Sequence, residues 1–305
     1  MKILVVRLSS MGDIIHALPA VASLKHSFPH SHVAWVIRQR WTPLLENNPF
    51  VDEVIPFERT LSGIVETRRE LRKTRFDLAI DFQGLVQSAL VAAAARPDRI
   101  AGFHRSQVRE KGATLFYSLC VQARAEHVVD RNLELVAAAG ASSLLHTFSL
   151  PEGSPEGDLP EGNFVLASPL AGWGSKQWPI EFYQELAQRL DIPLVVNGPP
   201  DAAEILAKIR GAHVHLSGIA GLIHATRLAR AVVGVDSGPL HLAAALSKPG
   251  VAIFGPTDPL RNGPYGGTIR VLRPAGVATT YKRAAATHDS MRAISPDDVL
   301  EALPA

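Results

Sequence analysis

The feature that most constrains the fold is an alternation of short apolar runs with segments of helical spacing, which occurs twice along the chain. In the first half, the apolar runs occupy 2–8, 32–37, 52–57, 76–82 and 99–103. In the second half, they occupy 164–169, 192–198, 213–218, 231–238, 251–255 and 268–273. Runs that are apolar at consecutive positions are typical of parallel strands covered on both faces. The pattern therefore predicts an α/β protein with a doubly wound parallel sheet in each half.

A proline-rich stretch separates the two halves. Residues 149–163 read SLPEGSPEGDLPEGN, a mixture of proline, glycine and acidic residues without periodicity, which is typical of a linker. We therefore expect a first domain at 1–150, a linker at 151–163 and a second domain at 164–290. The remaining residues, 291–305, are expected to form a C-terminal helix that packs back on the first domain.

Composition and charge exclude several classes of protein. Hydrophobic residues make up 47% of the 305 residues and charged residues 20%, the balance of an ordinary globular protein. The formal net charge of +2 gives no sign of a nucleic-acid partner. The single cysteine, Cys120, excludes an intramolecular disulfide and fits a reducing compartment. No apolar run approaches the roughly 18 residues of a membrane-spanning helix, so we expect a cytoplasmic protein.

The first strand leads into a turn that carries a carboxylate. In VVRLSSMGDIIHALPA, Asp13 follows Gly12 where the strand gives way to a helix, and Pro19 marks a kink or a restart of that helix. Strand-to-helix turns of parallel sheets commonly bind ligands. Aspartate is also a favoured helix cap, so the residues by themselves leave both a functional and a structural interpretation of Asp13.

A second candidate site follows the strand at 231–238. In GVDSGPLHLAAAL, Asp236, Ser237 and Gly238 precede a helix that carries His241 in its first turns, and the exposed amides of a helix N-terminus bind anions. Ser237 adds a hydroxyl, and His241 can donate to a phosphate or a hydroxyl. The alternative is an N-cap serine followed by a histidine that faces the core.

The loop SPLAGWGSKQWP offers further donors on the same half of the chain. Lys176 suits a diphosphate, and Ser168 and Ser175 supply hydroxyl groups. A single loop lysine is more often only solvated. Because both loops follow strands of one predicted parallel sheet, their donors meet at its carboxyl edge. This arrangement favours a nucleotide diphosphate as the ligand.

Several motifs, taken in order, resemble the glycosyltransferase family 9 heptosyltransferases. They are RLSSMGDIIHALPA, DFQGLVQSAL, GFHRSQVREKGATLFYS, HVVDRNLEL, GSKQWP, GVDSGPLHLAAAL with VAIFGPTDP, and MRAISPDDVLEAL. The resemblance is strongest to the members that add the first heptose to the lipopolysaccharide inner core. It implies the GT-B fold, in which two Rossmann-like domains face a central cleft. It also implies transfer of heptose from ADP-L-glycero-D-manno-heptose to a Kdo sugar of lipid A, with inversion at the anomeric carbon.

The resemblance assigns roles to the candidate residues. Asp13 matches the proposed general base, which takes the proton of the acceptor hydroxyl in a single displacement. Donor binding falls to the two loops of the second half, at Ser168, Ser175, Lys176, Asp236, Ser237, Gly238 and His241. We expect no metal site and no cofactor, since these groups can offset the charge of the departing ADP. The family's ribose-binding acid falls near NGPPDAAE, where Asp201 or Glu204 is the candidate.

The acceptor carries carboxylates and phosphates, so the resemblance implies a basic first domain. Arg105 and Arg109, with Lys111, form one cluster, and we assign Gly12 and Gln83 to the acceptor as well. A second cluster occupies the stretch 59–75, at Arg59, Arg68, Arg69, Arg72, Lys73 and Arg75. We expect it to make reversible contact with the cytoplasmic face of the inner membrane, although such charged helices are often only solvated. His127 and Asp130 are expected to cap or brace a helix that ends at Gly140.

Three classes of function remain open. The first is the heptosyltransferase. The second is another enzyme on a similar frame, either a family 9 transferase with a different nucleotide sugar or acceptor, or a non-NAD nucleotide-sugar epimerase. The third is a nucleotide- or NAD-binding module, which is disfavoured because RLSSMGD stands where G-x-G-x-x-G would follow the first strand.

Overall fold

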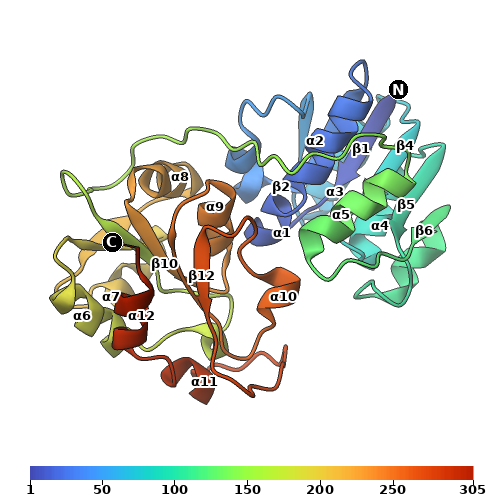
Figure 1. Cartoon of the computed structure of the whole chain (residues 1–305). Helices are drawn as coiled ribbons and strands as arrows, with labels where there is room; N and C mark the ends of the chain where they lie inside the picture. The colour runs from blue at the N-terminus through green and yellow to red at the C-terminus, as the bar shows by residue number, and fades with distance from the viewer. Residues whose placement is uncertain (305) are drawn as a thin grey trace. The chain divides into compact units, whose positions relative to one another are not determined.

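The computed structural model describes residues 1–304, which divide into two compact units (Figure 1). The first unit is Met1–Pro151, and the second begins at Glu152. Each unit contains one six-stranded sheet with helices on its faces. No helix within residues 1–304 combines the length and the apolarity needed to cross a bilayer.

The sheet of the first unit has the strand order β3-β2-β1-β4-β5-β6, and every neighbouring pair is parallel. Its strands are β1 (Lys2–Val6), β2 (His32–Arg38), β3 (Glu53–Phe57), β4 (Leu78–Asp81), β5 (Arg99–Phe103) and β6 (Leu119–Val121). Its helices are α1 (Met11–Ile15), α2 (Leu18–Ser27), α3 (Leu61–Leu71), α4 (Val86–Ala94) and α5 (Val128–Ala138), with 3₁₀ helices η1 (Gln39–Leu45) and η2 (Lys111–Phe116). The edge strand β6 was not predicted, because its apolar run is only three residues long and none of these residues is fully buried.

Local sequence explains the helix boundaries in this unit. Pro19 lies in the first turn of α2, where a missing amide hydrogen costs nothing, so it restarts the helix after α1 as predicted. His127 caps α5 by accepting a hydrogen bond from the amide of Val129. Gly140 follows the end of α5 with a φ of 117°, a conformation that glycine adopts without strain.

The second unit repeats the same topology, with the order β12-β11-β10-β7-β8-β9 and parallel pairing throughout. Its strands are β7 (Val165–Ser168), β8 (Leu194–Gly198), β9 (His213–Leu216), β10 (Ala231–Val235), β11 (Gly250–Ile253) and β12 (Ile269–Leu272). Its helices are α6 (Ile180–Arg189), α7 (Ala203–Leu206), α8 (Ile219–Leu228), α9 (Gly238–Ala245), α10 (Pro259–Asn262), α11 (Asp289–Arg292) and α12 (Pro296–Ala302), with η3 (Gly174–Lys176) and η4 (Pro200–Ala202). Both sheets are therefore doubly wound, as the alternating pattern predicted.

The C-terminal residues do not pack where we expected them. Met291, Ile294 and Val299 are buried in the core of the second unit, and α12 contacts α6, β11 and β12. The expectation that 291–305 packs back on the first domain was therefore wrong. The physical reason is that these apolar side chains complete the core of their own unit.

The predicted linker is tied to the units by hydrogen bonds. The carbonyl of Glu156 accepts from His215 Nε2 at 2.6 Å, and its Oε2 accepts from the amide of Gly218 at 2.6 Å. On the other side, the carbonyl of Ser149 accepts from the side-chain amide of Asn48 at 2.9 Å. The stretch has no helix or strand between α5 and β7, in keeping with its composition.

Candidate active site

Most of the candidate residues follow the two central strands of each sheet. In both units, the strand order reverses direction between two neighbours, β1 and β4 in the first unit and β7 and β10 in the second. Ligands of doubly wound proteins bind outside the carboxyl ends of the strands at such switch points. Asp13 follows β1 and Gln83 follows β4, while Lys176 follows β7 and Asp236 follows β10. Each unit therefore carries a half-site at its switch point.

In the first unit, Asp13 is held by two neighbours. Its Oδ2 accepts hydrogen bonds from the backbone amide and the hydroxyl of Ser10, at 3.0 and 2.8 Å. Its Oδ1 lies 2.5 Å from Nη2 of Arg7. Asp13 is therefore the N3 residue of a capping box whose N-cap is Ser10, which gives it a structural role at the start of α1. The side chain of Asp13 is still 41% exposed, so a substrate can reach the carboxylate.

Arg7 was not predicted as part of the site. Its side chain is only 10% exposed, and besides Asp13 it donates to the carbonyl of Phe82. It thereby joins the turn after β1 to the end of β4. The signal in the sequence was a single charged residue inside the apolar run at 2–8. Gly12, which we assigned to the acceptor, is buried in the first turn of α1.

A buried carboxylate fixes the loop after β4. Asp81 is completely buried and accepts hydrogen bonds from Tyr117 Oη at 2.7 Å, Ser88 Oγ at 2.8 Å and the amides of Gln83 and Gly84. Burial raises the pKa of Asp81, against the opposing effect of these donors. Gln83 in turn accepts from the amide of Leu8 through Oε1 at 2.8 Å. The network places Gln83 beside the turn that carries Asp13.

The loop that carries the candidate arginines is attached to the same place. Glu110 donates its amide to the carbonyl of Gly84 and accepts from the first amide of α4 through Oε2, at 3.2 and 2.8 Å. Gly84 has a φ of 66°, and a β-carbon there would lie 2.9 Å from Val108, so only glycine allows this approach. Arg105 and Arg109 are exposed on this loop.

In the second unit, Lys176 is buried and paired, so it is not a solvated loop lysine. Its Nζ lies 3.0 Å from Asp236 Oδ2, and both side chains are 10% exposed. His241 Nε2 lies 3.6 Å from the other oxygen of Asp236. Burial opposes ionisation, but the interaction with His241 and the charge of Lys176 outweigh it and lower the pKa of Asp236 to about 2. Asp236 is therefore an anion that holds two potential donors in place.

The residues next to Lys176 and Asp236 in the sequence carry buried hydroxyl groups, Ser175 and Ser237. The side-chain oxygens of Ser175 and Ser237 are buried and have no hydrogen-bond partner within residues 1–304. Ser237 occupies the N-cap of α9, yet its hydroxyl makes no capping bond. Pro239 lies in the first turn of the helix, as predicted, and Gly238 precedes it. A buried hydroxyl without a partner is costly, so these groups are suited to a polar ligand.

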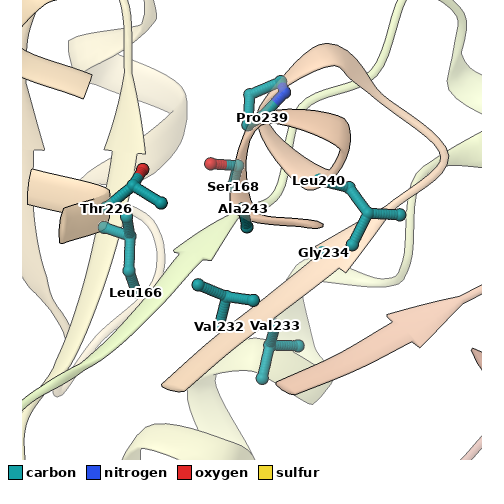
Figure 2. A pocket seen from close by; sticks show the side chains of 9 residues that line it. All are labelled: Leu166, Ser168, Thr226, Val232, Val233, Gly234, Pro239, Leu240 and Ala243. Carbon is teal, nitrogen blue, oxygen red and sulfur yellow. The ribbon is translucent and has the colours of Figure 1, made fainter. Parts of the chain in front are cut away.

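Ser168 is the last residue of β7 and pairs with Gly234 of β10. It lines a small cavity beneath the start of α9, between β7, β10 and α8 (Figure 2). The other residues that line the cavity are mostly apolar, namely Leu166, Thr226, Val232, Val233, Gly234, Pro239, Leu240 and Ala243. Such a lining does not suit a charged diphosphate.

The ring of Trp173 contacts Lys176 and also a second cation, Arg283. The sequence did not predict this contact. Lys176 Nζ lies 4.2 Å and the Arg283 guanidinium 5.0 Å from the ring centre of Trp173. The loop that bears Arg283 is fastened here, since the amide of Ser175 donates to the carbonyl of Ala284 at 3.0 Å. Stacking of cations on tryptophan is favourable, and it concentrates positive charge at this half-site.

The remaining candidates have weaker support. Asp201 lies in η4 and Glu204 in α7, after β8, and the hydrogen bonds and ion pairs described for the second unit include neither side chain. His127 acts as a helix cap, as expected. Asp130 lies 3.8 Å from His146 Nε2. Within residues 1–304, no group of three or more histidine, cysteine or acidic side chains is placed to share a metal ion.

Comparisons with known proteins agree with this architecture. Residues 64–287 match the family described as glycosyltransferase family 9 (heptosyltransferase). The chain is 32% identical over 297 residues to lipopolysaccharide heptosyltransferase 1 of Pseudomonas aeruginosa, which covers 87% of this chain and 82% of that protein. It is 30% identical over 351 residues to lipopolysaccharide heptosyltransferase 2 of Salmonella typhimurium, and the alignment covers 99% of this chain and 97% of that protein.

A solved structure extends the match to three dimensions. The structure of Escherichia coli heptosyltransferase WaaC with ADP-2-deoxy-2-fluoro heptose superposes with a TM-score of 0.78 at 27% identity. It covers 99% of this chain and 98% of that one. The two doubly wound units are thus those of the GT-B fold. With the family match spanning more than half of its length, the chain belongs to glycosyltransferase family 9, the heptosyltransferases.

Proposed function

We propose that this glycosyltransferase moves heptose from ADP-L-glycero-D-manno-heptose to a Kdo sugar of the lipopolysaccharide inner core, with inversion at the anomeric carbon. The observation that carries the proposal is the pair of half-sites at the switch points. One presents a reachable carboxylate, Asp13, and the other presents the buried pair of Lys176 and Asp236 with unpartnered hydroxyls. Relatives named lipopolysaccharide heptosyltransferases support the choice of donor and pathway.

The second unit binds the donor. Lys176 offsets the charge of the diphosphate, and the amides at the start of α9 and the hydroxyls of Ser175 and Ser237 donate to its oxygens. His241 lies on the same helix and adds a further donor. Asp236 positions Lys176 and His241 rather than contacting the diphosphate, because two like charges would repel. These groups stabilise the departing ADP without a cofactor.

The first unit supplies the base. Asp13 accepts the proton of the acceptor hydroxyl while that oxygen bonds to the anomeric carbon and the bond from this carbon to the diphosphate breaks. One displacement inverts the configuration and releases ADP. Arg7 positions the carboxylate through its short contact with Oδ1. The other oxygen is held by Ser10, so the orientation of the side chain is fixed before the acceptor binds.

The acceptor contacts the exposed loop next to Gln83 and Gly84. Arg105 and Arg109 recognise its carboxylate and phosphates, for which a guanidinium is well suited. Because the lipid portion of such an acceptor stays in a bilayer, the enzyme works in the cytoplasm in reversible contact with the inner membrane.

One comparison favours a different acceptor as the alternative. The relative from Salmonella typhimurium named heptosyltransferase 2 aligns with 99% of the chain at 30% identity, close to the value for heptosyltransferase 1. The alternative function is therefore transfer of heptose, or of another sugar, to a core that already carries a heptose.

A donor screen tests the proposal. The purified protein is incubated with a Kdo-lipid acceptor and ADP-, UDP- or GDP-activated sugars, and release of each nucleoside diphosphate is measured. We expect ADP release with ADP-heptose that depends on the acceptor. Release of UDP or GDP at a higher rate would overturn the assignment of the donor.

A further inference from the structure

Helix α3 presents an apolar surface to solvent. Leu61 is 87% exposed, Val65 57% and Ile64 46%, although each is an aliphatic residue in an ordered helix. The helix instead buries a narrow face made of Gly63, Thr67 and Leu71. An amphipathic helix normally buries its aliphatic residues. This helix keeps three of them outside the core of its unit.

The exposed aliphatic residues continue into a row of arginines. By helical spacing, Arg68 and Arg72 follow Leu61 and Val65 on the same face, one and two turns further along. Desolvation and the neighbouring charges of Arg68 and Arg96 lower the pKa of Arg72, as expected where cations cluster. This face of α3 is therefore aliphatic in its first half, at Leu61 and Val65, and cationic in its second half, at Arg68 and Arg72.

Neighbouring elements extend this surface. Arg59, just before α3, donates to Gln87 Oε1 of α4 at 2.9 and 2.6 Å. One turn along α4, Leu90 is 51% exposed, and α4 contacts η2, where Leu115 is 86% exposed. Since α3 begins at the carboxyl end of β3, its aliphatic end lies at the same edge of the sheet as Asp13.

We propose that α3 is a membrane-docking helix, whose residues Leu61, Ile64 and Val65 insert into the interface of an anionic bilayer while Arg68 and Arg72 contact lipid phosphates. Aliphatic residues flanked by cations are the pattern of helices that lie in a membrane interface. The inference rests on the proposed function, in which the acceptor is a lipid. It adds an apolar contribution to binding, which a purely electrostatic contact lacks.

Flotation with lipid vesicles measures this contribution. The variant L61Q/I64Q/V65Q replaces the three exposed aliphatic residues with glutamine, a residue that favours helices. Leu228→Gln is the matched control, because Leu228 is 54% exposed on α8 of the other unit. With vesicles of phosphatidylcholine and phosphatidylglycerol, we expect the triple variant to partition on the order of 100-fold more weakly. The control should bind as the wild type does.

A fluorescent probe tests insertion directly. Ile64→Trp should shift its emission to the blue on addition of these vesicles and be quenched by brominated acyl chains, whereas Leu228→Trp should do neither. High salt should weaken the binding of the wild type without abolishing the apolar contribution. Binding of the triple variant equal to that of the wild type, or a tryptophan at position 64 that stays in water, would overturn the inference.

Two further outcomes separate this inference from its alternatives. If the exposed face pairs two copies of the chain, sedimentation will show a wild-type dimer that the glutamine variant dissociates, and docking to lipid is refuted. Turnover of a deacylated, water-soluble acceptor should be the same in the triple variant and the wild type. An enzyme that transfers heptose but binds vesicles independently of α3 refutes the inference while the proposed function stands.

Discussion

Replacement of Asp236 by asparagine should destabilise the second unit by an amount that follows from its pKa. The pKa of this carboxyl is lowered from 3.8 to about 2, because His241 and Lys176 favour the anion more than burial disfavours it. Asparagine resembles the protonated carboxyl, so the loss corresponds to the difference in free energy between the two protonation states. At ~1.36 kcal/mol per pKa unit, we expect a loss of about 2 kcal/mol in the free energy of unfolding at pH 7.

The dependence on pH provides a sharper signature. A carboxyl whose pKa is lowered on folding stabilises the folded state. This stabilisation is fully present above the unfolded-state pKa of about 3.9, and it is lost as the pH falls through the folded-state pKa. The difference in unfolding free energy between wild type and Asp236→Asn should therefore be constant above about pH 5, shrink progressively below that pH and approach zero near pH 1.

The assay is urea-induced unfolding at several pH values, followed by the fluorescence of Trp173 and Trp178 in the second unit. A second variant isolates the cause. Adding Lys176→Met to Asp236→Asn removes the buried cation that the first change leaves without its partner, so the double variant should be more stable than Asp236→Asn. Equal stability of wild type and Asp236→Asn at pH 7, or a loss that does not vary with pH, would refute the reasoning.

Four further changes probe the half-sites and the hydrogen-bond network around Asp81. Asp13→Asn should lower kcat by about two to four orders of magnitude with ADP affinity unchanged by calorimetry, and near-normal turnover would leave Asp13 as a helix cap only. Lys176→Ala should weaken ADP binding as well as turnover, and unchanged ADP affinity would remove Lys176 from the donor site. Arg109→Ala should raise KM for the acceptor but not for the donor, which initial-rate kinetics with each substrate varied will show. Tyr117→Phe removes a hydrogen bond to the buried Asp81 and should cost about 1.5–3 kcal/mol of stability in thermal unfolding, whereas a neutral change would show that the network does not depend on it.

The fold could be predicted because its strands leave a local signal. Each of the eleven expected strands is present in the structure. The central strands, such as β4, β7 and β10, are buried along their whole length, and a strand buried on both faces must be apolar at consecutive residues. The start of α2 at Pro19 and the end of α5 near Gly140 follow from the backbone geometry of those residues. The short strand β6 leaves only a weak signal, because its apolar run has just three residues.

The site could be predicted only in part, because its contacts depend on which strands are neighbours. The motifs indicated Lys176 and Asp236 separately, and their pairing requires β7 to lie beside β10. Arg7 reaches the end of β4 for the same reason, since β1 and β4 are adjacent. The packing of the C-terminal helix was predicted wrongly, as an apolar face does not specify the core that it joins.

We propose that this family 9 enzyme adds heptose to Kdo with Asp13 as its base. The most direct measurement is mass spectrometry of a reaction that contains ADP-heptose and equal amounts of a Kdo-lipid acceptor and the same acceptor already carrying one heptose. We predict that wild type adds a single heptose to the Kdo-lipid first, and that Asp13→Asn forms almost no product. Preferential extension of the heptosylated acceptor would overturn the assignment of Kdo as the acceptor, and full product formation by Asp13→Asn would overturn the assignment of the base.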